Sequence, residues 1–228
     1  MNKQAALLDW DGTLRKGFTM ADWIRFLVKH NYFNIYAADR LKNLFQNYES
    51  GADDYSVLAT QAANIYATGL AGKSVDYTRE LAKNFVQLDR EIYEFVPRLF
   101  SMLHNHNICI IVVSGVPQVV LEEFKVKFGM NVVFGIQAYS RLGHWTKRVL
   151  LNPASSEGKL KKVSQLIKTY DIVLSLGDTE ADTPLLTIAK LPLIMKRQDI
   201  HRNESFNIPN GIYVDDNTLL KTVETAFS

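Results

Sequence analysis

The sequence predicts an α/β protein with a mostly parallel sheet and a block of helices inserted near its start. Three observations support this prediction. An apolar run ends at Asp9, residues 19 to 88 follow a helical period, and the chain beyond residue 89 alternates short apolar strands with helices. Such alternation favours right-handed crossovers between parallel strands. We therefore expect the first strand to join the sheet of the far half, so that the sheet-bearing part of the chain is discontinuous.

The first strand delivers two carboxylates into a glycine turn. Leu7 and Leu8 precede Asp9, and Asp11 is followed by Gly12. Side chains two residues apart on a strand share a direction, and ligands of open α/β folds bind at the carboxyl ends of the strands. Asp-Gly is also a common turn dipeptide, in which Asp11 would only bond its own backbone. The opening stretch by itself leaves both interpretations open.

The inserted block has apolar residues at spacings of three and four, as in Trp23, Phe26 and Leu27. This period is typical of amphipathic helices. Breaks near residues 31–34, 50–53 and 69–74 divide the block into about four helices.

The far half is predicted to alternate between the two kinds of element. The order is a helix at 90–105, a strand at 108–113, a helix at 117–128, a strand near 132–134, a hairpin or extended excursion across 136–149, a helix at 156–169, a strand at 172–175, a helix at 183–189, a strand at 192–195, and a final strand and helix around 212–227. Pro97 marks either a kink or a helix start.

The composition excludes several classes of protein. The chain has 228 residues with 26 Lys and Arg against 24 Asp and Glu, and this balance does not indicate a nucleic-acid or anionic-membrane partner. No apolar stretch reaches the length of about 20 residues that spans a bilayer, and the N-terminus lacks the apolar core of a signal peptide. We expect a cytoplasmic protein. Cys109, the single cysteine, lies in an apolar run and is expected to be a buried, inert thiol.

Two further strand ends carry polar groups. Ser114 and Gly115 follow the strand at 108–113, where a hydroxyl and free amides could cradle a phosphate or simply cap the next helix. Asp178, Glu180 and Asp182 follow the strand at 172–175. Acids at this density repel one another unless a cation is present, and their oxygen atoms are ligands that suit Mg²⁺. The alternative is that Asp178 and Glu180 only favour the N-terminus of the next helix through its dipole.

Lys159 lies in the first turn of the helix that begins near residue 156. A lysine there opposes the helix dipole, which suggests a functional use. Lys147, Lys161 and Lys162 are nearby alternatives.

These motifs, in this order, resemble those of the haloacid dehalogenase superfamily, and specifically its phosphatases. Asp9-Trp10-Asp11-Gly12-Thr13 is similar to the first motif, Ser114 to the second, Lys159 to the third, and the segment from Gly177 to Asp182 to the fourth. The resemblance implies a Rossmann-like three-layer core made of residues 1–16 and 90–228. It also implies that residues 17–89 form a helical cap domain, as in the phosphoserine-phosphatase-like branch.

The resemblance also implies a role for each site residue. Asp9 would be the nucleophile, Asp11 the general acid and base, and Lys159 a catalytic cation that also binds phosphate. Ser114 and the amide of Gly115 would bind phosphoryl oxygens. Asp9, Asp178 and the backbone carbonyl of Asp11 would hold Mg²⁺, with Asp182 orienting Lys159 or a metal-bound water.

The implied function is Mg²⁺-dependent hydrolysis of a small phosphorylated metabolite through an aspartyl phosphate. A phosphomutase or phosphotransferase that uses the same aspartate, and a catalytically silent binding protein, are the alternatives. A dehalogenase would not need the second acid at Asp11. Phosphoserine phosphatases carry an acid just after the first motif to meet the substrate ammonium, whereas this chain has Arg15-Lys16-Gly17-Phe18. Phosphoserine is therefore not the implied substrate.

Overall fold

The computed structural model describes residues 2–196 and 206–227. Its helices and strands follow one another in this order: β1 (Lys3–Leu8), α1 (Thr19–Lys29), α2 (Ile35–Glu49), α3 (Tyr55–Leu70), α4 (Val75–Leu88), α5 (Val96–Asn105), β2 (Cys109–Pro117), α6 (Gln118–Phe128), β3 (Val132–Arg141), β4 (His144–Leu151), α7 (Ser156–Leu166), β5 (Tyr170–Gly177), the 3₁₀ turn η1 (Glu180–Asp182), α8 (Thr183–Leu186), β6 (Leu191–Met195), β7 (Ile212–Val214) and α9 (Leu219–Phe227). The predicted α/β class is confirmed.

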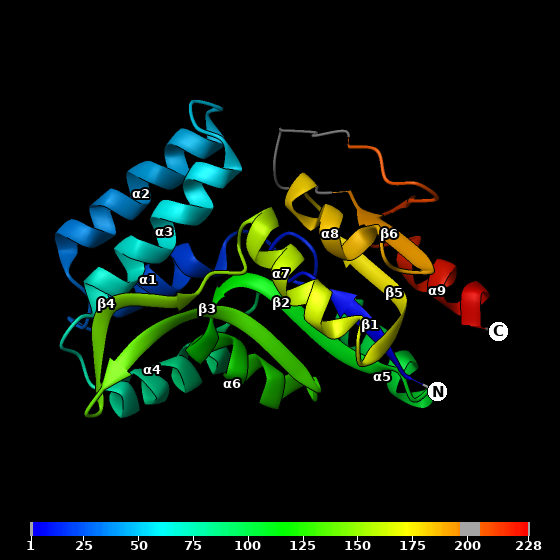
Figure 1. Ribbon diagram of the computed structural model, residues 1–228. Coiled ribbons are helices and arrows are strands. Elements are labelled where there is room, and N and C mark those ends of the chain that lie inside the picture. Colours follow the sequence, from blue (N-terminus) through cyan, green and yellow to red (C-terminus); the bar gives the residue numbers. More distant parts are fainter. Residues whose placement is uncertain (1, 197–205, 228) are drawn as a thin grey trace.

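The described strands form one seven-stranded sheet in the order β4-β3-β2-β1-β5-β6-β7 (Figure 1). Every neighbouring pair is parallel except β3 and β4, which form an antiparallel hairpin. The first strand lies in the middle, with Leu8 opposite Val112 of β2 and Leu176 of β5. The sheet is therefore assembled from both ends of the chain, as the sequence predicted.

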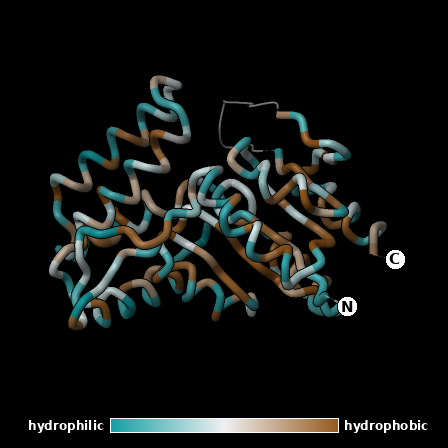
Figure 2. The backbone as a smooth tube through the Cα atoms, in the orientation of Figure 1, coloured by the Kyte–Doolittle hydropathy of each residue, from teal (hydrophilic) through white to brown (hydrophobic). Residues whose placement is uncertain are grey.

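The sheet lies between two layers of helices because its strands bury both faces. Ala6 and Leu8 belong to a core shared with α5, α6 and α9, whereas Ala5 and Leu7 belong to a second core shared with α7 and α8. Successive strand residues point to opposite faces, so one apolar run serves both cores. The central strands accordingly stand out as hydrophobic in Figure 2. Cys109 lies in the second core as a buried free thiol.

The inserted block consists of the four predicted helices, α1 to α4. The side chain of Asn34 caps α2 by accepting a hydrogen bond from Ala37 N (3.1 Å), and Ser74 caps α4 in the same way from Tyr77 N (3.3 Å). Gly72, with φ of 80°, makes the left-handed turn between α3 and α4. The caps begin α2 and α4, and the turn follows the end of α3, at the breaks that the sequence indicated.

The block does not stand apart from the rest of the molecule. Helix α4 packs against α6, and α3 packs against β4. The segment between α3 and α4 also bonds to the hairpin, with Gly72 N donating to Trp145 O (2.8 Å) and Val75 N donating to Gly143 O (2.9 Å). Helices α2 and α3 extend furthest from the sheet (Figure 1). The division into a core of 1–16 and 90–228 and a cap of 17–89 remains a prediction.

Some boundaries differ from those expected. Helix α5 begins at Val96 rather than at residue 90, because Pro97 occupies its first turn and residues 91–93 instead pair with the segment that follows β1. Helix α8 covers four residues only, since the 3₁₀ turn η1 precedes it. The segment 136–149 is a hairpin. No helix among residues 2–196 and 206–227 is long and apolar enough to cross a bilayer.

Candidate active site

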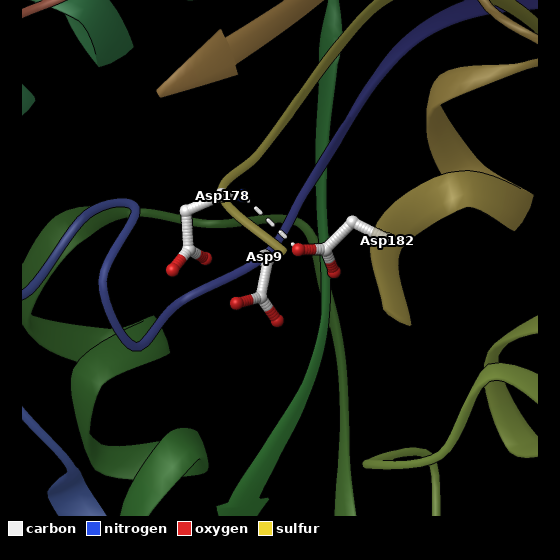
Figure 3. Close-up of side chains that lie close together, drawn as sticks. All are labelled: Asp9, Asp178 and Asp182. Atoms are coloured by element: carbon white, nitrogen blue, oxygen red, sulfur yellow. Dashed lines mark hydrogen bonds between the residues drawn. The ribbon is translucent and has the colours of Figure 1, made fainter. Parts of the chain in front are cut away.

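The ends of β1 and β5 bring three buried acids together. Asp9, Asp178 and Asp182 each offer a carboxylate oxygen, and these atoms lie within 4.8 Å of one another (Figure 3). Asp9 follows β1, and its amide donates to Leu176 O of β5 (2.9 Å), which fixes the two strand ends side by side. The residues predicted from distant parts of the sequence therefore meet at the carboxyl edge of the sheet.

Lys159 from the first turn of α7 is the lysine that reaches this cluster. Its Nζ donates to Asp9 Oδ1 (2.9 Å) and also bonds to Asp182 Oδ1, and its side chain is 2% exposed. Lys147 and Lys161 are exposed, and Lys162 lies over the ring of Phe134. Among the four lysines that the sequence offered, geometry selects Lys159.

Asp182 is held in place by hydrogen bonds that turn its other oxygen toward β5. Its Oδ2 accepts from the amides of Asp178 and Thr179 (3.0 Å each) and from Thr179 Oγ1 (3.1 Å). In Figure 3 this oxygen points toward the backbone at Asp178, and the carboxyl groups of Asp9 and Asp178 lie next to each other. Gly177 is required here, because a Cβ on it would lie 2.5 Å from Asp182 Cβ. Asp182 therefore positions Lys159.

Two threonines that the sequence analysis did not assign to a role orient the remaining acids. Thr13 Oγ1 donates to Asp178 Oδ1 (2.8 Å), and the amide of Thr19 donates to both oxygens of Asp11 (3.0 Å each), with a further bond from its hydroxyl. Thr19 is the first residue of α1, so Asp11 caps that helix. A cap eight residues away across a turn carries no spacing signal, which explains why the sequence did not reveal this contact.

A small cavity of about 40 Å³ opens onto these acids. The predicted residues Asp9, Asp11, Asp178, Ser114 and Gly115 all line it. The rest of its lining is Phe18, Met20, Phe45, Tyr55, Leu58, Ala59, Ala62, Ile136, Ala154 and Thr179. Ser114 is buried, and the position of Gly115 is close-packed, since a Cβ there would lie 3.0 Å from Ala154 Cβ. The strand end at Ser114 and Gly115 thus faces the same space as the acids.

Burial and neighbouring charges perturb the ionisable groups of the site. Burial raises the pKa of Asp9, which Lys159 counteracts and Asp182 and Asp178 reinforce. Burial lowers the pKa of Lys159, but the attraction of Asp182 and Asp9 outweighs it and the net pKa is raised. Lys159 therefore remains charged. Three acids against one cation make an electronegative site that an added cation would stabilise.

The donor set suits a magnesium ion. Lys159 occupies one oxygen of Asp9, and Asp182 is taken up by Lys159 and the backbone amides, so Asp9 and Asp178 are the acids oriented to hold a cation. An all-oxygen set with few carboxylates is what Mg²⁺ prefers.

The fold and the site together define an α/β protein with a cluster of buried acids at the carboxyl edge of a mostly parallel sheet. The sequence model of the haloacid dehalogenase-like hydrolase family matches residues 6–187. The chain belongs to this family, which confirms the resemblance seen in the four motifs. No curated protein matches the chain in a sequence comparison.

Solved structures share the fold at low sequence identity. A protein of unknown function from Bordetella pertussis Tohama I superposes with a TM-score of 0.72 at 20% identity, covering 86% of this chain and 91% of that one. A substrate-bound phosphoserine phosphatase has a TM-score of 0.64 at 17% identity, covering 97% and 99% of the two chains. A phospho-aspartyl intermediate analogue of phosphoserine phosphatase has a TM-score of 0.59 at 17% identity, covering 86% and 87%. These likenesses show a common fold.

Proposed function

We propose that the protein hydrolyses the phosphate monoester of a small metabolite, with Mg²⁺ bound and with Asp9 as the nucleophile. One observation carries this proposal: a buried acid at the end of β1 shares a lysine with a second acid and lies beside a third. Membership of a hydrolase family supports it further, as does the likeness in fold to a substrate-bound phosphoserine phosphatase and to a phospho-aspartyl intermediate analogue of phosphoserine phosphatase.

The first step would form a bond between Asp9 and phosphorus. Lys159 bonds to Asp9 Oδ1, and a carboxylate oxygen of Asp9 would attack in line while the bond from phosphorus to the leaving oxygen breaks. Asp11 would donate its proton to that oxygen. Ser114, the amide of Gly115 and Lys159 would bind the equatorial oxygens, where charge spreads in the transition state.

The second step would return the enzyme to its starting state. Asp11, now ionised, takes a proton from water, the water oxygen bonds to phosphorus, and the bond from phosphorus to Asp9 breaks to release phosphate. General acid and base help of this kind is worth about 10²–10⁴-fold. Mg²⁺, held by Asp9, Asp178 and the backbone carbonyl of Asp11, would neutralise phosphoryl charge when bound. Asp182 would keep Lys159 in position throughout.

We also propose that residues 17–89 act as a lid over this chemistry. The block supplies Phe18, Phe45, Tyr55 and Leu58 to the lining of the cavity, opposite the acids of the sheet edge. A closed lid excludes water and strengthens electrostatic interactions inside the site.

The test is phosphate release from a panel of phosphate monoesters, with Mg²⁺ and with EDTA. We expect release that EDTA abolishes, and Asp9→Asn should lower kcat by at least about 10³-fold while circular dichroism stays unchanged. Retained activity in Asp9→Asn would refute the nucleophile. Transfer of phosphate to a second substrate molecule would indicate a mutase or phosphotransferase, and no release from any ester would favour a binding protein.

The choice of lysine has its own control. Lys159→Ala should lower kcat by at least about 10²-fold, because it removes a cation from the transition state. Lys147→Ala, at an exposed position on β4, should leave the rate unchanged. The opposite result would reassign the role.

A further inference from the structure

The lining that the inserted block gives to the cavity is apolar apart from Tyr55. The block contributes Phe18, Met20, Phe45, Leu58, Ala59 and Ala62, and Ile136 and Ala154 add apolar surface from outside the block. The ionisable groups that line the cavity are the three acids Asp9, Asp11 and Asp178, together with the hydroxyl of Tyr55. No basic side chain is among the described residues of the lining. The part of a substrate beyond its phosphate would therefore meet hydrocarbon.

The basic residues of the block lie elsewhere. Arg25 has a side chain that is 77% exposed and pairs with Asp22 of its own helix, and it lines a separate groove. Lys29 and Arg40 are exposed. Lys159 is buried between Asp9 and Asp182, so its charge is already matched. None of these cations is placed to meet a carboxylate on a leaving group.

Tyr55 is the hydrogen-bonding group that the block adds to this apolar wall. Its hydroxyl lies 3.8 Å from where a Cβ on Gly115 would be, which places it beside the end of β2. Its ring packs edge-on against Tyr48 (5.6 Å between centroids), and no hydrogen-bond partner for the hydroxyl occurs in the part of the chain that the structure describes. Burial raises the pKa of Tyr55, so the hydroxyl stays protonated and can donate to a ligand.

We propose that the site selects phosphate monoesters of short, uncharged alcohols, and that Tyr55 donates a hydrogen bond to an oxygen on the leaving group. This proposal rests on the proposed function. A carboxylate in the pocket would lose its hydration, find no cation and face the acids of the site. An ammonium would likewise lose water against the apolar residues of the block, because Asp9 and Asp178 would hold the metal ion and Asp11 accepts hydrogen bonds from Thr19. A cavity of about 40 Å³ also favours short groups, since a cavity of about 150 Å³ is what holds a benzene ring.

The experiment compares four esters that share a two-carbon leaving group. Ethyl phosphate is neutral and apolar, 2-hydroxyethyl phosphate adds a hydroxyl, phosphoethanolamine adds an ammonium, and phosphoglycolate adds a carboxylate. We expect kcat/KM for the two neutral esters to exceed that for the two charged ones by at least about 100-fold, the range set by leaving a buried charge unpaired. Comparable rates for phosphoglycolate or phosphoethanolamine would overturn the selectivity while leaving the phosphatase function intact. Hydrolysis of none of the four, nor of any other ester in the panel, would instead refute the function itself.

Tyr55→Phe tests the role of the hydroxyl. In the wild type, 2-hydroxyethyl phosphate should be the better neutral substrate by about 10-fold, the range of one hydrogen bond, and Tyr55→Phe should remove that preference by lowering kcat/KM for 2-hydroxyethyl phosphate more than for ethyl phosphate. Tyr36→Phe is the matched control, because Tyr36 lies on α2 with 78% of its surface exposed. Equal losses on both esters in Tyr55→Phe would mean that the hydroxyl serves the phosphate, and would overturn the proposed contact with the leaving group.

Discussion

Arg15 joins the two chain segments that connect the inserted block to the sheet. Its Nε donates to Asp89 Oδ2 (2.7 Å), at the end of α4, and its guanidinium also bonds to Asp22 of α1 (2.6 Å). Lys16 N donates to Glu91 O (2.9 Å) between the same two connecting segments. The side chains of Arg15 and Asp89 are 2% and 0% exposed. Arg15 is therefore a structural cation rather than a contact for substrate.

Removing the guanidinium would leave Asp89 buried without its counter-charge. Breaking a buried pair in this way is expected to lower the free energy of unfolding by about 3–5 kcal/mol. For a chain of this size, each kcal/mol lowers Tm by about 2–4 °C, so Arg15→Ala should lose about 6–20 °C. Arg15→Lys keeps the charge but loses the fork that reaches both acids, and should fall between the wild type and Arg15→Ala.

Urea unfolding followed by circular dichroism measures these changes. The matched control is Arg79→Ala, because Arg79 pairs with Asp76 on the surface, where the two side chains are 63% and 89% exposed. This variant should stay within about 0.5 kcal/mol of the wild type. If Arg15→Ala lowers the free energy of unfolding no more than Arg79→Ala does, the buried pair does not hold the two connecting segments together. If Arg15→Ala does not fold, Arg15→Lys still tests the order of stabilities.

Three further variants test other parts of the structure. Mg²⁺ at 100 times its Kd should raise the free energy of unfolding of the wild type by about 2.7 kcal/mol, and Asp178→Asn should abolish the rise in Tm that accompanies it. An equal rise in Tm in both proteins would place the metal elsewhere. Gly158→Ala should lower activity more than stability, as measured by kcat and Tm, because its Cβ would lie 2.0 Å from a backbone oxygen and displace the adjacent Lys159. Hydrogen bonds from Thr218 lower the pKa of Asp215, so its stabilising effect on the start of α9 is present above the ordinary carboxyl range and lost as the pH falls; Asp215→Ala should lower Tm at about pH 7 and less so at about pH 2, and a constant difference would contradict this.

The order of elements could be predicted because each is encoded locally. The helical period of α1 to α4, the apolar runs of β1, β2 and β5, and the breaks between them specify type and order without knowledge of contacts. Pairing between segments that are distant in sequence could not be predicted in this way. The late start of α5 reflects pairing of residues 91–93 with the segment after β1, and such pairing depends on partners that are distant in sequence.

In the candidate site too, local sequence predicts some residues, whereas others can be found only from the folded geometry. Asp9 and Asp178 were predictable because each follows a strand, and Ser114 because it lies near the carboxyl end of β2, since parallel strands end at one edge of the sheet. The choice of Lys159 over its neighbours needed the geometry of α7. Thr13 and Thr19 were not predicted as partners of the acids, because a threonine that donates across a turn has no spacing of its own. The proposed selectivity also depends on which residues of α3 line the cavity, and the helical period alone does not give these.

The inserted block and the site chemistry meet at Asp11. The carboxylate of Asp11 accepts hydrogen bonds from Thr19, the first residue of α1, so the orientation of the proposed proton donor depends on where that helix begins. Arg15, four residues further along the chain from Asp11, ties α1 to Asp89 at the end of α4, and so fixes the same helix from its other connection. A displacement of the block would therefore move the proton donor as well as the wall that carries Tyr55. The position of the insertion, directly after Asp9 and Asp11, thus couples the proposed recognition of the leaving group to its proposed protonation.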